Sequence, residues 1–224
     1  MEAREAGPEA RESERGGAPA ERLREGGERM SEVKELLVCL TGASGMVYAD
    51  RLLRKVMSRV ERVGLVLTPQ GAEMAAHELG WAMDFDKLEL TGPTAEVSEQ
   101  ARLYHPEDLS PLYATGSPAP DAMVVIPCTV GAVARIAAGL GDTLMTRGAA
   151  VCLKNRKPLV LVVRDAPLSL IDLRNLTALA EAGATIMPAS PTFYPPRETI
   201  EELADHFAED VLEHLGLGED DSGS

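Results

Sequence analysis

The sequence lacks any uninterrupted apolar run of about 18 residues, the length that a membrane-spanning helix requires. It also lacks an amino-terminal pattern of positive charge followed by an apolar stretch, so we expect neither secretion nor membrane insertion, and a cytoplasmic protein. Basic residues are scarce, with 22 Lys and Arg against 36 Asp and Glu and a net charge of −14. Because this charge would repel a phosphate backbone, the composition argues against nucleic acid as a partner.

Cysteine is also rare. Cys39, Cys128 and Cys152 are the three in the chain, and none has a second cysteine at C-x-x-C spacing or histidines at ligand spacing. We interpret them as buried structural thiols, since an isolated cysteine in apolar surroundings behaves as a small hydrophobic residue. With no acidic metal cluster in the sequence either, we expect no metal ion.

The two ends of the chain are poor in large apolar side chains. Residues 1–33 are crowded with Glu, Arg, Gly and Pro, so they bury too little apolar surface to offset the entropy of ordering, and we predict a disordered extension. Residues 218–224 are acidic and small, which predicts a flexible tail. Residues 34–217 remain as one globular domain, in a chain that is 45% hydrophobic.

Within this domain, short apolar runs alternate with segments of helical periodicity, a pattern typical of βαβ units. The expected strands are 35–41, 62–68, 122–127, 159–164 and 185–188, and the expected helices are 46–58, 70–79, 130–138, 143–155, 168–182 and 199–215. Right-handed crossovers then give an α/β fold, a three-layer α/β/α sandwich around a doubly wound parallel sheet of the Rossmann-like or flavodoxin-like kind. The proline-rich segment 84–120 is interpreted as an excursion outside the layered core, with room for an extra strand or helical turn.

The sharpest motif is Thr41-Gly42-Ala43-Ser44-Gly45, between the first expected strand and the first expected helix. Glycine lets the backbone approach a ligand closely, and free N–H groups at a helix start attract an anion, so the motif predicts a phosphate or nucleotide cradle. A plain tight turn is the alternative. The motif has neither the G-x-G-x-x-G spacing of dinucleotide folds nor a P-loop, which disfavours NAD and ATP.

Further polar residues follow the third and fourth expected strands and occupy the helix between them. Thr129 is either a ligand hydroxyl or a helix N-cap. Arg147 and Lys154 are two helical turns apart on one face, which is either a binding surface or a solvated basic face. Arg164 and Asp165 are either ligand groups or an internal salt bridge. We expect these residues to meet the glycine motif at one edge of the sheet and to share its ligand.

The chain resembles the flavin prenyltransferases, the UbiX family. The matching stretches are 40–45 (Leu-Thr-Gly-Ala-Ser-Gly), 126–129 (Ile-Pro-Cys-Thr), Arg147, 153–154, 157–164, 181–184 and 193–194 (Phe-Tyr). The resemblance implies an enzyme that transfers a dimethylallyl group from dimethylallyl phosphate to N5 and C6 of reduced FMN. The product, prenylated FMN, would serve a UbiD-type decarboxylase. The resemblance also implies a homo-dodecamer built from trimers, with FMN between subunits and without a metal.

The same resemblance implies roles for individual residues, which fall into three groups. It assigns FMN binding to Gly42, Ala43, Ser44, Thr68, Thr129 and Arg147, catalysis to Ser44, Glu78, Lys154, Arg164 and Asp165, and binding of the prenyl phosphate to Lys154, Arg164 and Tyr194.

The sequence departs from the family at several of its positions. Asp165 stands where the family has glutamate, Asp210 falls where a basic residue on the last helix holds the prenyl phosphate, and a carboxy-terminal Arg-Trp is missing. A carboxylate at position 210 would repel the phosphate dianion, unless Arg197 or a basic residue of another subunit compensates. Two alternatives therefore stay open: an FMN-binding carrier or regulatory paralogue, and a flavin-dependent cysteine decarboxylase. The decarboxylases have a Pro-x-x-x-Asn-Thr signature, which is absent here.

Overall fold

The computed structural model describes residues 33–92, 100–110, 120–194 and 196–218. The predicted amino-terminal extension and acidic tail lie outside these ranges except for one residue each, so both stay predictions. Pro195 also lies outside them.

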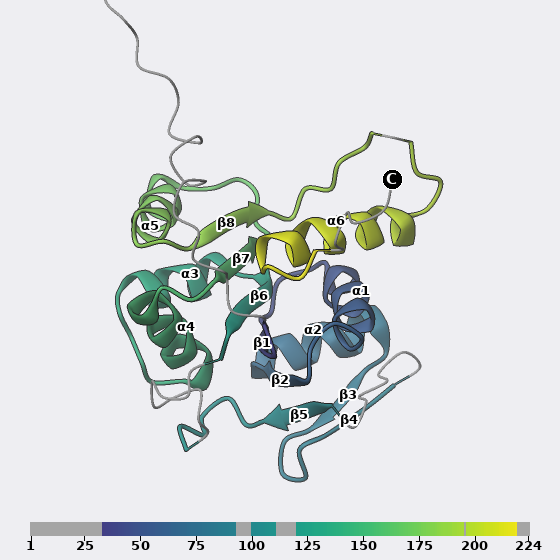
Figure 1. Cartoon of the computed structure of the whole chain (residues 1–224), viewed down its shortest axis with the longest axis horizontal. Helices are drawn as coiled ribbons and strands as arrows, with labels where there is room; N and C mark the ends of the chain where they lie inside the picture. The colour runs from purple at the N-terminus through teal and green to yellow at the C-terminus, as the bar shows by residue number, and fades with distance from the viewer. Residues whose placement is uncertain (1–32, 93–99, 111–119, 195, 219–224) are drawn as a thin grey trace, which may run out of the picture. The chain divides into compact units, whose positions relative to one another are not determined.

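A six-stranded sheet, parallel throughout, forms the centre of the domain (Figure 1). In spatial order the strands are β5 (Ala101–Tyr104), β2 (Arg62–Leu67), β1 (Glu35–Leu40), β6 (Ala122–Cys128), β7 (Leu159–Val163) and β8 (Thr185–Pro188). The five strands expected from sequence are confirmed, with ends that differ by at most one residue.

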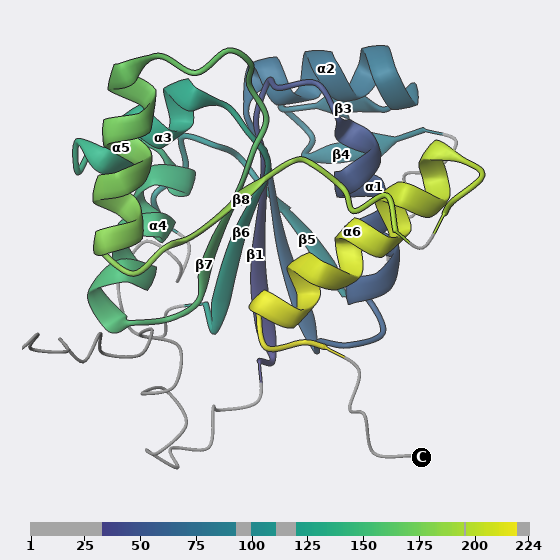
Figure 2. The ribbon, with the colours of Figure 1, turned by 90° about the horizontal axis from the view of Figure 1, so that it is seen from above.

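Helices cover both faces of the sheet, as Figure 2 shows. One layer contains α1 (Met46–Val56), α2 (Pro69–Leu79) and α6 (Ile200–His214), and the other contains α3 (Val130–Ala137), α4 (Leu144–Asn155) and α5 (Leu170–Glu181). The predicted three-layer, doubly wound sandwich is therefore confirmed. Within the part of the chain that the structure describes, no helix is both long and apolar enough to cross a membrane.

The two-residue repeat of a β-strand explains how one sheet supports two cores. On β1, Leu36 and Val38 face the core beneath α1, α2 and α6. The alternate residues, Leu37 and Cys39, face the core beneath α3, α4 and α5. Because both faces are covered, the strand is apolar at every position and shows no alternation of polar and apolar residues.

The segment 84–120 was predicted to lie outside the layered core, and that prediction is wrong for its middle part. Residues Ala101–Tyr104 form β5, the sixth strand of the main sheet, paired with β2. Before it, β3 (Ala82–Asp84) and β4 (Glu89–Thr91) form a separate antiparallel pair. A four-residue edge strand has too few positions to show an apolar pattern, and Arg102 interrupts this one, so no sequence pattern identifies it as a strand.

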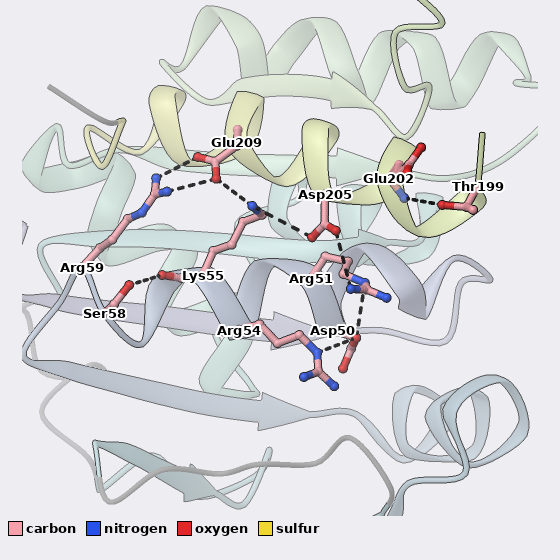
Figure 3. A network of polar contacts seen from close by, with 10 residues as sticks. All are labelled: Asp50, Arg51, Arg54, Lys55, Ser58, Arg59, Thr199, Glu202, Asp205 and Glu209. Carbon is pink, nitrogen blue, oxygen red and sulfur yellow. Dashed lines mark hydrogen bonds and ion pairs between the residues drawn. The ribbon is translucent and has the colours of Figure 1, made fainter. Parts of the chain in front are cut away.

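Helix α6 is fixed to α1 by a ladder of ion pairs (Figure 3). Glu209 accepts two hydrogen bonds from the Arg59 guanidinium, at 2.8 and 3.0 Å, and pairs with Lys55 Nζ at 2.8 Å. One turn earlier, Asp205 pairs with Arg51 at 3.5 Å. Phe207 and other apolar residues of α6 are buried beside this ladder, so both apolar and ionic contacts hold the last helix in place.

Candidate functional site

The site lies where the strand order reverses. From β1 the chain moves outward through β2 to β5 and then returns to β6 on the other side of β1. In open parallel sheets, ligands collect at such a switch point, outside the carboxyl ends of the strands. Here the two strand ends are tied together by Thr41, whose hydroxyl donates to the Pro127 carbonyl at 2.8 Å and accepts from the Thr129 N–H at 2.9 Å.

A cavity of about 440 Å³ opens at this edge of the sheet. Its walls come from the end of β1, the amino ends of α2, α3 and α4, and the segment that follows β5. The lining residues are Thr41, Gly42, Thr68, Pro69, Gln70, Pro106, Glu107, Thr129, Gly131, Ala132, Arg135, Thr143 and Met145.

Three helices begin at this cavity, each capped by a threonine. The side chains of Thr68, Thr129 and Thr143 accept hydrogen bonds from the backbone N–H of residues three positions later, on α2, α3 and α4. The positive ends of three helix dipoles therefore converge on one cavity, and an anion is stabilised there. Thr129 is thus both a helix N-cap and a cavity residue.

Two glycines shape the cavity. A Cβ on Gly42 would lie 2.5 Å from Gln70 Cβ, so only glycine allows the turn after β1 to approach the start of α2 this closely. A Cβ on Gly131 would meet only the Thr129 hydroxyl, at 3.9 Å, because it would project into open space. A planar, largely apolar ring system with an anionic tail fits walls of this kind, and FMN has both parts.

The amino end of α1 forms a second polar group beside the cavity. The Glu78 carboxylate on α2 accepts hydrogen bonds from the N–H groups of Gly45, at 3.0 Å, and Met46, at 2.8 Å. These are N–H groups that the glycine motif was predicted to offer to a phosphate, so that prediction needs correction: Glu78 is their partner. The reason is that α2 ends close to where α1 begins, a proximity that the sequence does not reveal.

Predicted residues from three elements meet at this amino end. Ser44 is exposed just before Gly45. Arg164, the residue after β7, extends toward the same turn: a Cβ on Gly45 would lie 4.0 Å from Arg164 Cγ. Among the residues that the structure describes, Arg164 has no ion-pair partner. The predicted internal salt bridge of Arg164 with Asp165 is therefore not formed, and Asp165 accepts the Ala166 N–H instead.

Lys154 does not join this group, contrary to the expectation that all the polar motifs share one edge of the sheet. It lies in the last turn of α4, whereas Thr143 and Met145 at the start of that helix line the cavity. Ten residues of helix separate Leu144 from Lys154, a rise of about 15 Å. The chain then enters β7 beside the start of β6, where the Met123 N–H donates to the Pro158 carbonyl. Lys154 therefore lies near the amino ends of the strands, whereas Arg164 lies at their carboxyl ends.

The remaining residues singled out from the sequence do not line the cavity. Ala43 is buried, and Arg147 is exposed on the first turns of α4, with its Cδ 3.6 Å from the position a Cβ would take on Gly141. Tyr194 is 81% exposed in the loop before α6, next to Phe193 at 74%. Asp210 lies on α6, where its carbonyl contacts His214 Nδ1 at 2.8 Å.

Sequence reasoning missed several cavity residues. Arg135 lines the cavity and forms a close ion pair with Asp142. Pro106 and Glu107 reach the cavity from the segment after β5, where the Pro106 carbonyl accepts the Leu144 N–H at 2.8 Å. Finding them required knowing that β5 joins the main sheet. Among the described residues, no group of three or more His, Cys, Asp or Glu is arranged to hold a metal ion.

Comparison with known proteins agrees with this geometry. The model of the Flavoprotein family matches residues 25–209. The flavin prenyltransferase UbiX of Methanothermobacter thermautotrophicus is 35% identical over 191 residues, which cover 85% of this chain and 95% of that protein. This chain belongs to the UbiX family of flavoproteins.

Solved structures of UbiX-family proteins share the fold. A dodecameric FMN-dependent UbiX-like decarboxylase from Escherichia coli O157:H7 superposes with a TM-score of 0.73 at 32% identity, covering 82% of this chain and 96% of that one. AnUbiX (PadA1), in complex with FMN and dimethylallyl pyrophosphate, gives a TM-score of 0.72 at 30% identity, covering 85% and 98%.

Proposed function

We propose that this UbiX-family chain is a flavin prenyltransferase, which transfers a dimethylallyl group from dimethylallyl phosphate to N5 and C6 of reduced FMN. The observation that carries the proposal is the combination of two features. One is a cavity at the start of three helices; the other, beside it, is a group made of a carboxylate, a hydroxyl and a cation that has no ion-pair partner among the described residues. The known structure of AnUbiX, with FMN and a prenyl diphosphate bound together, supports it.

FMN would occupy the cavity. Gly42, Thr68 and Thr129 are expected to contact it, with Ala43, Ser44 and Arg147 beside them. The converging helix ends favour its phosphate, and the apolar walls favour its ring system. When bound and reduced, FMN supplies the nucleophile. No metal ion enters this scheme.

The prenyl phosphate would bind at Arg164, next to the turn that precedes α1. Its C–O bond would break, and the phosphate would leave with the bonding electron pair. A bond to flavin N5 would replace the C–O bond as N5 loses its proton; the bond to C6 would form at the expense of the prenyl C=C bond, with one proton added to the prenyl group and one lost from C6. Arg164 stabilises the charge that develops on the departing phosphate, with Asp165 beside it. Glu78, which is within hydrogen-bonding distance of the α1 backbone, moves protons together with the Ser44 hydroxyl.

Lys154 and Tyr194 would complete the phosphate site from another subunit. Within one subunit Lys154 is at the wrong edge of the sheet to reach a ligand of Arg164. Tyr194 and the neighbouring Phe193 are both largely exposed within one subunit, and we expect another subunit to cover them. A homo-oligomer, which we propose to be a dodecamer built from trimers, supplies both residues; the dodecameric Escherichia coli relative supports this assembly.

The product would be prenylated FMN, delivered in the cytoplasm to a UbiD-type decarboxylase. Asp210 favours a second candidate function. If a cation at this position of α6 is needed to hold the prenyl phosphate, the chain binds FMN without transfer and acts as a flavin carrier or regulatory paralogue. An Asp210→Arg variant distinguishes the two, because a gain in affinity for dimethylallyl phosphate would identify a transferase that has lost its phosphate site.

Release of inorganic phosphate tests the proposed function. The protein is incubated anaerobically with dimethylallyl phosphate and either reduced or oxidised FMN. We expect phosphate release only with reduced FMN, at one phosphate per flavin consumed. Flavin binding without phosphate release would favour the carrier. Mixing inactive Lys154→Ala and Arg164→Ala subunits is the matched experiment: recovery of part of the activity requires sites built from two subunits, and no recovery contradicts them.

A further inference from the structure

Tyr48, on the first turn of α1, lies at the phosphate side of the candidate site, although no motif identified it. A Cβ on Gly45 would lie 3.2 Å from Cδ2 and 3.3 Å from Cε2 of Tyr48. The same point is 4.0 Å from Arg164 Cγ. The Tyr48 ring and the aliphatic stem of Arg164 therefore both lie next to Gly45, at the amino end of α1.

The Tyr48 ring packs against a second aromatic ring, that of Phe207. Its centroid is 4.9 Å from the ring centroid of Phe207 on α6, with the two planes at 55°. Phe207 is buried, and α6 is fixed to α1 by the ion pairs of Glu209 and Asp205. A tilted pair of rings at this distance is a favourable arrangement, so Tyr48 has little freedom to turn away from Arg164.

Arg164 needs such a support. It is exposed, it follows the last residue of β7, and its guanidinium has no ion-pair partner among the described residues. A long unpaired side chain samples many rotamers, and each must be given up when a phosphate binds. A fixed aromatic ring beside the same turn would remove some of these rotamers before the ligand arrives.

The two side chains also interact electrostatically. Burial raises the pKa of the Tyr48 phenol above its usual value, and the positive charge of Arg164 partly offsets that rise. The charge of Arg164 is thus close enough to influence the phenol in the absence of any ligand.

We propose that Tyr48 is a positioning residue that, braced by Phe207, holds Arg164 over the amino end of α1 in the orientation that receives a prenyl phosphate. The inference rests on the proposed function for the identity of the ligand. The placement of Tyr48 and Arg164 beside Gly45 does not depend on that function. We assign the role to the ring and not to the hydroxyl, because ring carbons are the Tyr48 atoms nearest to the position that a Cβ on Gly45 would take.

The kinetic test compares Tyr48→Leu with Tyr48→Phe in the full chain. We expect Tyr48→Leu to raise the KM for dimethylallyl phosphate about tenfold with the Kd for FMN unchanged, and Tyr48→Phe to behave as the unmodified protein. In an Arg164→Ala background, Tyr48→Leu should cause no further rise in KM, because its effect passes through Arg164. Equal, additive losses in both backgrounds, or a parallel loss of FMN affinity, would overturn the proposal.

A second measurement does not require transferase activity. The phenol pKa of Tyr48 is measured by tyrosinate absorbance in the ligand-free protein, with Tyr48→Phe identifying its contribution among the four tyrosines. Arg164→Ala should raise this pKa, since a nearby positive charge is removed. If the pKa rises but no phosphate is released in any variant, the proposed function fails and the positioning contact stands. If the pKa does not change, the positioning role fails whatever the activity.

Discussion

Substitution of two glycines at the cavity, Gly42 and Gly131, should change the stability of the protein in opposite directions. Both substitutions should weaken flavin binding. At Gly42, an alanine Cβ would lie 2.5 Å from Gln70 Cβ and 3.2 Å from its carbonyl carbon. Neither atom is the far end of a flexible side chain, so the backbone must move. Overpacking of this kind costs about 1–3 kcal/mol of unfolding free energy. Gly42→Ala should therefore destabilise the protein and weaken FMN binding together.

Gly131 separates the two effects. It lies in the first turn of α3, and a side chain there would meet only the Thr129 hydroxyl, at 3.9 Å, before entering the cavity. Replacing glycine in a helix by leucine stabilises the helix by up to about 1 kcal/mol. Gly131→Leu should thus leave the unfolding free energy equal or higher and still weaken FMN binding at least about tenfold, or about 1.4 kcal/mol.

The assay is a flavin fluorescence titration, with urea unfolding of each variant in parallel. Gly131→Leu is decisive because a loss of flavin affinity cannot be ascribed to unfolding. A stable Gly131→Leu protein that binds FMN with unchanged affinity would refute the assignment of this cavity to the flavin.

Two further predictions concern stability and thiol reactivity. Burial raises the pKa of Glu209, but hydrogen bonds from Lys55 and Arg59 outweigh burial and hold the pKa below its usual value. The stabilising contribution of Glu209 is therefore complete near neutral pH and is lost as the pH falls and the carboxylate becomes protonated. In urea titrations, Glu209→Gln should lower the unfolding free energy by about 1–2 kcal/mol at pH 7. The difference between the two proteins should be smaller at pH 3. Burial also raises the pKa of the Cys128 thiol to about 12, so iodoacetamide should leave it unmodified in the folded protein at pH 8, and rapid labelling measured by mass spectrometry would contradict the buried site.

The sequence was sufficient for the layered fold because both faces of the sheet are covered. Buried parallel strands such as Ala122–Cys128 are apolar at every position, and turn residues and N-cap threonines mark where each following helix begins. The strand β5 was not predicted because it is short and contains Arg102. It also lies at the edge of the sheet, where a strand needs fewer apolar residues.

The sequence predicted which residues belong to the site better than it predicted how they are arranged in space. Gly42, Thr68 and Thr129 line one cavity because each follows a strand, and the carboxyl ends of parallel strands lie at one edge. Lys154 was misplaced because the prediction used only the face of the helix and not its rise, which puts Lys154 at the far end of α4 from the cavity. The hydrogen bonds of Glu78 to the start of α1 depend on the packing of α2 beside α1, which no local pattern encodes.

The mass of the flavin after the reaction tests the central claim most directly. The protein is mixed anaerobically with reduced FMN and dimethylallyl phosphate. The flavin is then extracted, and its mass is measured by mass spectrometry. A gain of one five-carbon prenyl unit, absent in Glu78→Gln, is the predicted result. Recovery of unmodified FMN from a protein that binds both ligands would contradict prenyl transfer and leave the flavin carrier as the function of this chain.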